Sequence, residues 1–134
     1  MRRWLAAALC ISAAAAHGAA EDCGRSLGST ATRLSEGGVV LIFNPSIRPI
    51  AAGQHFSVDF VLCAAGPAAD EVRVDAQTPE HRHGMNYRAS VRPLGNGSYR
   101  AEGLLFHMPG RWNLIFDVRR GNTVLRLSQA LQVE

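Results

Sequence analysis

The stretch Trp112-Asn-Leu-Ile-Phe-Asp-Val118 decides the fold, because apolar and polar side chains alternate along it with a period of two. One face of this stretch is polar except at Ile115. The other face carries four large apolar side chains, Trp112, Leu114, Phe116 and Val118. Alternation of this kind predicts a half-buried β-strand. We expect Trp112 to pack in the core rather than to stack on a ligand.

The same alternation recurs on both sides of this stretch. It places apolar side chains on one face at Phe56, Val58, Phe60 and Leu62, at Val72 and Val74, and at Leu125, Leu127, Leu131 and Val133. Turn-forming sequences such as Leu94-Gly-Asn-Gly97 and Arg120-Gly-Asn122 separate these segments. About seven short strands in roughly 100 residues predict an all-β fold, an immunoglobulin-like antiparallel β-sandwich. A small barrel is the competing prediction.

The first residues indicate export from the cytoplasm. Met1-Arg2-Arg3 is followed by an apolar run from Trp4 to Ala16 and by the small residues Gly18-Ala-Ala20, as in a secretory signal peptide. We therefore expect residues 1–20 to be a cleaved signal peptide, residues 21–38 a loosely ordered lead-in, and residues 39–134 the packed domain. The mature protein would be periplasmic or secreted, and soluble.

Two cysteines remain after the predicted cleavage, Cys23 and Cys63. In an oxidising compartment such thiols normally pair, so we expect a disulfide that tethers the lead-in to the domain. The alternative is that both thiols are copper ligands, but cysteine pairs that bind copper are usually close in sequence, and these are not.

The composition and the missing motifs argue against a nucleic-acid-binding protein and against an enzyme. The chain has 14 basic and 11 acidic side chains and no basic tract with interleaved aromatic residues, so we expect no nucleic-acid partner. It lacks a Gly-x-Ser-x-Gly elbow, a phosphate-binding glycine loop and a His-Glu-x-x-His helix. We therefore expect a protein that is not an enzyme and has no small-molecule substrate.

Candidate metal ligands are concentrated in two short segments, His81-Arg-His-Gly-Met85 and Phe106-His-Met-Pro-Gly110. These hold three of the five histidines and two of the three methionines. Imidazole suits copper and zinc, whereas a thioether favours Cu(I), so the combination predicts copper, with Cu(I) preferred and zinc as the second choice. The predicted ligands are His81, His83, Met85 and Met108, with His107 as a further candidate.

The spacing of the ligands in the first segment limits how they can bind one metal ion together. His81, His83 and Met85 are two residues apart, which puts them on one side of an extended segment. Thr78-Pro79 and Gly84 instead favour an irregular loop, in which the turn itself would have to bring the rings together. The flanking Asp75 and Glu80 are candidates to orient the imidazoles as hydrogen-bond acceptors.

Adjacent residues in a strand point to opposite faces, so His107 and Met108 are not both expected to bind the metal directly. We favour Met108 as the ligand, with His107 as a ligand or as its supporting group. His55 alternates outward from its apolar neighbours, and we expect a surface residue. The plain alternative for the whole set is a loop shaped by Pro79, a core methionine and exposed histidines without a role.

Three elements resemble the YtkA-like domain and the related FixH proteins: Pro79-Glu-His-Arg-His-Gly-Met85, Gly97-Ser-Tyr99, and Gly103-Leu-Leu-Phe-His-Met-Pro-Gly-Arg-Trp112 with Phe116. The resemblance covers roughly residues 39–133. It implies a secreted or membrane-attached immunoglobulin-like sandwich that handles copper or assists membrane copper systems, such as oxidase assembly.

Two features depart from that family pattern. YtkA-like elements commonly read Met-Pro-x-His-x-His, whereas Gln77-Thr-Pro79 lacks the leading methionine. FixH-type proteins carry a membrane helix, and the only candidate here is the predicted signal segment. The sequence therefore predicts a periplasmic copper-binding protein, a carrier or an accessory to a membrane copper enzyme or transporter. The alternative function is an interaction module that docks on a membrane or periplasmic complex without metal.

Overall fold

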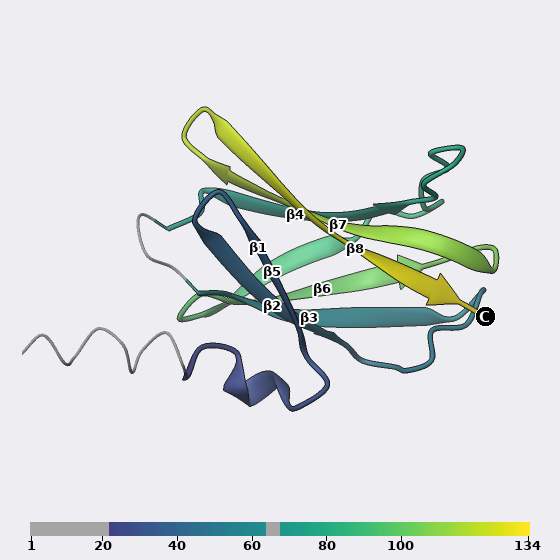
Figure 1. Cartoon of the computed structure of the whole chain (residues 1–134), viewed down its shortest axis with the longest axis horizontal. Helices are drawn as coiled ribbons and strands as arrows, with labels where there is room; N and C mark the ends of the chain where they lie inside the picture. The colour runs from purple at the N-terminus through teal and green to yellow at the C-terminus, as the bar shows by residue number, and fades with distance from the viewer. Residues whose placement is uncertain (1–21, 64–67) are drawn as a thin grey trace, which may run out of the picture.

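The computed structural model describes residues 22–63 and 68–134 of the chain. The predicted signal peptide, residues 1–20, lies outside the described residues. Eight strands form two antiparallel sheets that pack face to face (Figure 1). The larger sheet has the order β1 (Thr32–Glu36), β2 (Val39–Pro45), β3 (His55–Cys63), β6 (Ser98–Leu105), β5 (Ser90–Gly95). The smaller sheet has the order β4 (Glu71–Gln77), β7 (Gly110–Arg120), β8 (Thr123–Val133).

This arrangement confirms the predicted β-sandwich and shows that the barrel alternative is wrong, because the two sheets stay separate. Strands β2 to β8 divide as the seven strands of a constant-type immunoglobulin domain do. In that comparison β2, β3, β6 and β5 correspond to strands A, B, E and D, and β4, β7 and β8 to strands C, F and G. The eighth strand, β1, extends the larger sheet beyond β2.

The core lies between the two sheets and is built from the alternating residues. The four large apolar side chains of β7 that face inward are all fully buried, and Phe43, Phe60 and Phe116 pack ring against ring. Trp112 is among the fully buried residues, as predicted. Ile115 is also buried, although it lies on the outer face. It sits on the central strand of the small sheet, between Asp75 of β4 and Ser128 of β8, and side chains from both neighbours surround it.

The segment before β2 is more ordered than the sequence predicts. Residues 32–36 form β1, which pairs antiparallel with β2 from Thr32 opposite Phe43 to Glu36 opposite Val39. The expectation of a loose lead-in is wrong for these residues. Gly37 and Gly38, both with positive φ, make the tight turn that joins the two strands. Only five residues long and mostly exposed, β1 offers too short an alternation to be recognised from sequence.

The disulfide between Cys23 and Cys63 is present, as predicted, with the two Cα atoms 5.7 Å apart. Since the sulfurs are bonded to each other, the alternative in which both thiols bind copper is wrong. The bridge holds the segment around the 3-10 turn η1 (Arg25–Leu27) against the outer face of the larger sheet. There Gly24 lies directly on the buried side chain of Ile42.

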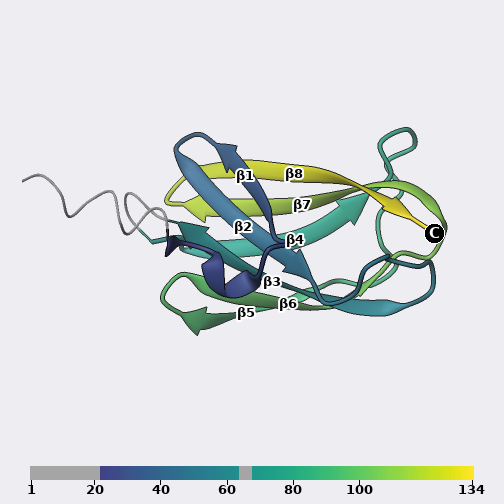
Figure 2. The same ribbon diagram turned by 60° about the horizontal axis from the view of Figure 1, so that its bottom comes forward.

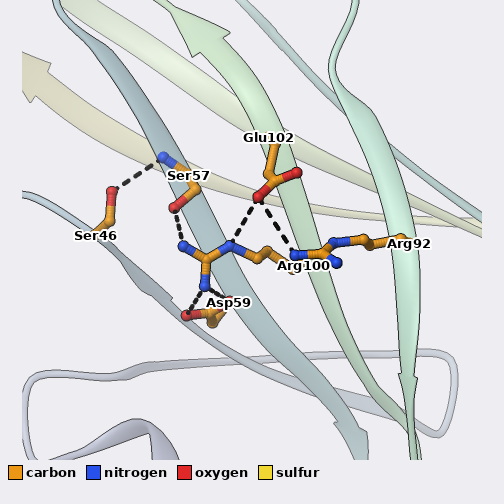
Figure 3. A network of polar contacts seen from close by, with 6 residues as sticks. All are labelled: Ser46, Ser57, Asp59, Arg92, Arg100 and Glu102. Atoms are coloured by element: carbon orange, nitrogen blue, oxygen red, sulfur yellow. Dashed lines mark hydrogen bonds and ion pairs between the residues drawn. The ribbon is translucent and has the colours of Figure 1, made fainter.

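A polar network lies farther along the outer face of the larger sheet (Figure 3). The guanidinium of Arg100 on β6 donates to Asp59 and Ser57 on β3, at 3.2 and 3.0 Å, and to Glu102 at 3.2 Å. Glu102 also pairs with Arg92 on β5 at 3.6 Å. Each charge in the network has a partner of opposite sign. We therefore assign it to cross-strand stabilisation of the sheet surface, where such pairs contribute little individually.

Candidate functional site

The two segments that hold the candidate ligands lie at the same end of the sandwich (Figures 1 and 2). One is the connection from β4 to β5, residues 78–89, and the other is the turn between β6 and β7, residues 106–109. The start of β3 reaches the same end, since the N–H of Gly53 donates to the carbonyl of Phe106 at 2.8 Å. His55 at the start of β3 also contacts Tyr87, with ring centroids 5.7 Å apart and the rings tilted by 52°. All five candidate ligands therefore share one end of the molecule.

Thr78 closes the loop that carries the first two histidines. Its N–H donates to the carbonyl of His83 at 2.9 Å, and its side-chain Oγ1 accepts from the N–H of His83 at 3.0 Å. Its carbonyl accepts from the N–H of Arg82 at 2.9 Å. Beyond the loop, Gly84 forms an isolated antiparallel bridge with Gln77. The loop is therefore a closed turn at the end of β4, as Thr78-Pro79 and Gly84 indicated.

The turn brings His81 and His83 together. Their ring centroids are 5.9 Å apart, with an interplanar angle of 65°, and both residues are exposed. Arg82 between them has a φ of 53°, so the segment is not extended. The proximity of the two rings thus comes from the turn and not from strand alternation. The sequence predicted this possibility for an irregular loop, in which the turn itself brings the two rings together.

A single metal ion fits between two rings at this separation. A metal bound to a ring nitrogen at about 2.0–2.1 Å lies about 3.2 Å from the ring centroid, so two imidazoles on one ion have centroids at most about 6.4 Å apart. The 5.9 Å between His81 and His83 lies within that limit. The separation therefore leaves room for one ion between the rings, provided that one nitrogen of each ring faces it.

The two methionines occupy a different environment from the histidines. Met85 and Met108 are both partly buried and pack against the hydrophobic core. Met85 follows the histidine loop after Gly84, whereas Met108 lies in the β6–β7 turn. Part of each side chain therefore stabilises the sandwich, as the plain alternative held for Met108. Neither residue is fully buried, and both lie in the connections at the loop end of the molecule.

Trp112 fixes the β6–β7 turn. Its indole Nε1 donates to the carbonyl of Met108 at 3.0 Å, and its ring stacks on Phe106 at 4.8 Å between centroids. His107 is exposed and meets Trp112 edge to face, with the centroids 5.4 Å apart. Among the aromatic contacts of the described residues, His107 pairs with Trp112 and not with His81 or His83. The structure thus brings the two loop histidines together, whereas the ring of His107 contacts Trp112.

The two predicted supporting carboxylates remain predictions. Asp75 Oδ1 accepts from the N–H of Ala76 at 2.8 Å, and Glu80 is exposed in the loop. Across residues 22–63 and 68–134, no group of three or more His, Cys, Asp and Glu side chains is placed to hold a metal ion. A metal held by His81 and His83 would therefore need its further ligand from a thioether, a water molecule or another chain.

The structure also has a cleft that the sequence did not predict. It has a volume of about 710 Å³ and lies between the outer edge of β4 and the segment from Met85 to Val91. Five charged side chains line it: Glu71, Arg73, Asp75, Arg88 and Asp117. Those on β4 alternate with inward-facing valines, so in sequence they look like the ordinary exposed face of a strand.

One carboxylate of this cleft has a shifted pKa. Hydrogen bonds from the guanidinium of Arg73 and then from that of Arg119 hold the pKa of Glu71 below its ordinary value of 4.5, against a smaller opposing effect of burial. The same contact with Glu71 raises the pKa of Arg73. Asp117 is bound on its far side by Arg126, at 2.7 Å.

Solved structures share this fold. A DUF4426 family protein from Pseudomonas aeruginosa aligns with a TM-score of 0.53 and 11% sequence identity, over 76% of this chain and 93% of that one. A DUF4785 family protein from Legionella pneumophila aligns with a TM-score of 0.53 and 13% identity, over 72% of this chain and 29% of that one. At such low identity these similarities establish the fold alone.

No protein-family model and no curated protein matches the chain. The resemblance to YtkA-like proteins therefore stays a prediction from the sequence elements that carry it. In the described part of the chain, no helix has the length and apolar character needed to cross a membrane. The disulfide is compatible with an extracytoplasmic location, because such bonds persist in oxidising compartments.

Proposed function

We propose that this is a periplasmic copper-binding protein that carries Cu(I) or assists the assembly of a membrane copper system. The observation that carries the proposal is the pair of exposed imidazoles, His81 and His83, held 5.9 Å apart by a closed turn. Two neutral imidazoles make a partial binding site that is already formed before the metal arrives. Such a site exchanges its metal readily, because it does not enclose the ion.

The ligand chemistry supports copper over zinc. Structural zinc sites use four protein ligands and catalytic ones three, mostly His, Cys, Asp and Glu. The described residues bring no three such side chains together. Thioethers select Cu(I), and both half-buried methionines lie at the same end of the sandwich as the histidine pair. We therefore assign the ion to Cu(I), with His81 and His83 as the primary ligands and Met85 or Met108 as the completing thioether.

The compartment supports the same assignment. A disulfide between Cys23 and Cys63 implies an oxidising environment, and the apolar start of the sequence is typical of an exported chain. A periplasmic protein with an exposed metal pair is suited to passing copper to a membrane enzyme or transporter. The proposed recipient of the copper is a class of protein, a membrane copper system.

The test is an anaerobic Cu(I) titration against a chromogenic chelator, with the disulfide intact. The wild-type protein should withdraw one Cu(I) per chain, and the His81→Ala/Met108→Ala double variant should lose this ability. His55→Ala is the matched control, because His55 is an exposed histidine at the same end whose ring contacts Tyr87 and is no part of the proposed site.

Two results would contradict the proposal. One is that the chelator keeps all its copper in the presence of the wild-type protein. The other is that the double variant and the wild type bind equally well. In either case the competing function, docking on a membrane or periplasmic complex without metal, would gain support, and it predicts that a His81→Ala/His83→Ala variant keeps its partner.

A further inference from the structure

The cleft beside β4 lies against an open sheet edge. β4 is the outer strand of the smaller sheet and pairs only with β7, and β5 is the outer strand of the larger sheet and pairs only with β6. At the opposite side of the sandwich, β1 packs beside β8. An outer strand presents backbone N–H and C=O groups that no neighbouring strand satisfies. The cleft therefore has hydrogen-bonding groups along one wall.

The loop contacts show which backbone groups of β4 face outward. The N–H of Thr78 donates away from β7, to the carbonyl of His83. In a strand, every second residue directs its backbone polar groups to the same side, so those of Ala76, Val74 and Val72 also face outward. The N–H of Ala76 is already used by the Asp75 carboxylate. The groups of Val72 and Val74 remain, and both residues line the cleft.

The remaining walls define the chemistry of an occupant. Met85, Ala89 and Val91 are partly buried and pack on the core, so they give the cleft an apolar floor. Side chains of a guest strand opposite Val72 and Val74 point the same way as those valines, toward this floor. Apolar side chains at alternate positions of the guest would therefore be buried.

The guanidinium of Arg88 favours an acidic residue beside it in an occupant of the cleft. Glu71 is bonded to Arg73 and Arg119, and Asp117 to Arg126. Arg88, on the opposite wall, has no carboxylate within ion-pair distance among the described residues. Asp75 also has no ion pair among the described residues, but its Oδ1 accepts from the N–H of Ala76 at 2.8 Å. A preference for an acidic guest residue therefore comes from Arg88 and applies beside it.

We propose that an extended peptide segment of a partner protein, with apolar side chains at alternate positions and an acidic side chain between them, binds in this cleft as an added strand beside β4. Backbone hydrogen bonds to Val72 and Val74 hold it, and a carboxylate pairs with Arg88. Binding of this kind draws affinity from main-chain hydrogen bonds and specificity from the alternate side chains. Of the proposed copper ligands, Met85 lines the cleft and contributes to its apolar floor. The interaction needs no charge and no hydrogen bond from any of these ligands.

A second copy of the chain is a poorer occupant. The outer edge of β4 is open only at Val72 and Val74, because the histidine loop covers it from Ala76 onward. If the β4 strands of two copies pair antiparallel through Val72 and Val74, the two-fold axis of the pair passes beside Arg73. This pairing would place Arg73 directly opposite itself, and like charges in that position are destabilising.

The test uses a fluorescein-labelled nonapeptide, Ser-Val-Glu-Val-Glu-Val-Glu-Val-Ser, and fluorescence anisotropy with the disulfide-bonded protein. We expect saturable binding, at least about tenfold weaker affinity in Arg88→Glu, and a reversed preference of that variant for the peptide with Lys in place of Glu. Arg33→Glu on β1, at the far edge of the larger sheet, is the control for the charge change and should bind like the wild type.

Two further measurements test the backbone hydrogen bonds and the independence of peptide binding from the proposed metal site. The Glu peptide with N-methylated valines lacks the donors that face Val72 and Val74 and should not bind. The His81→Ala/His83→Ala variant should bind the unmodified peptide as the wild type does, so failure of the copper proposal and failure of this one are distinguishable. The proposal is overturned by equal binding of the N-methylated peptide, by equal losses in Arg88→Glu and Arg33→Glu, by no binding, or by a protein dimer that the peptide does not dissociate.

Discussion

His81 and His83 are exposed side chains, so water and protons reach both rings as freely as a metal does. A metal and a proton compete for the same ring nitrogen, because only the neutral imidazole binds a metal. We therefore expect the affinity for Cu(I) to fall as the pH is lowered below about 6. Chelator titrations at a series of pH values down to about 4.5 check this, and undiminished binding at the lowest pH would exclude histidine ligation.

Gly24 is the residue at which the N-terminal segment comes closest to the larger sheet. Its φ is +82°, and a Cβ added there would lie 2.5 Å from the Cδ1 atom of Ile42 and 2.9 Å from its Cβ. Gly24→Ala should lower the free energy of unfolding by more than about 1 kcal/mol, from backbone strain and overpacking together.

Gly28→Ala is the matched comparison for that change. Gly28 has a similar φ of +87°, but a Cβ added at this residue would have no atom within 4 Å. The excess loss in Gly24→Ala over Gly28→Ala, measured by chemical denaturation, isolates the contact with Ile42. Equal losses in the two variants would show that the contact is relieved at no cost.

The loop at the end of β4 depends on one threonine. Thr78→Val removes the hydroxyl that accepts from the N–H of His83 but keeps the backbone bond from Thr78 to the carbonyl of His83. The loss of one partly exposed hydrogen bond should cost about 0.5–1.5 kcal/mol locally and loosen the imidazole pair. We expect weaker Cu(I) binding by the chelator titration. Thr123→Val, at the exposed start of β8, should bind as the wild type does, and equal affinity of all three proteins would rule out a positioning role for Thr78.

The pairing of β4 with β7 has a pH-dependent component at Glu71. Its folded-state pKa lies below 4.5 because Arg73 and Arg119 donate hydrogen bonds to it. A lowered carboxyl pKa adds stability that is fully present above about pH 4.5 and is lost as the pH falls through the folded-state value. Glu71→Gln should therefore be less stable than the wild type at neutral pH and equal to it in strong acid. Thermal melts at the two pH values decide this, and a pH-independent difference would contradict it.

Strands with long alternation were predictable from sequence, because their inward faces dictate burial without reference to the rest of the chain. β7 is the clearest case, with Trp112 buried as expected. β1 was missed because only five residues alternate and its pairing with β2 depends on a partner strand. The proximity of His81 and His83 was predictable only as one of two alternatives, since it results from the φ of Arg82 and the hydrogen bonds of Thr78.

The cleft could not be read from sequence for a different reason. Its walls come from β4, from the connection that follows it and from Asp117 on β7, and only the packing of the two sheets brings these together. Along β4 the charges at positions 71, 73 and 75 have the period of any exposed strand face. Nothing local distinguishes an edge strand beside a cleft from an edge strand in open solvent.

At the scale of the whole molecule, the disulfide ties the N-terminal segment to the sandwich. It closes a loop of 40 residues in sequence, for which the chain-entropy treatment gives about 3–4 kcal/mol of stabilisation. The Cys23→Ser/Cys63→Ser variant should unfold at a correspondingly lower denaturant concentration. Its β1 strand should exchange amide hydrogens faster than β7 does, and an unchanged unfolding midpoint would contradict a net stabilisation by the bridge.

The bridge and the histidine loop lie at opposite ends of the sandwich. β3 begins at His55, beside Tyr87, and its ninth and last residue is the bridged Cys63. A strand of that length spans about 25–30 Å. The length of one strand therefore separates the cross-link of the described residues from the proposed copper site. An ion held at the histidine loop is too far away to contact the bridge sulfurs, so the bridge and the metal site can be altered independently.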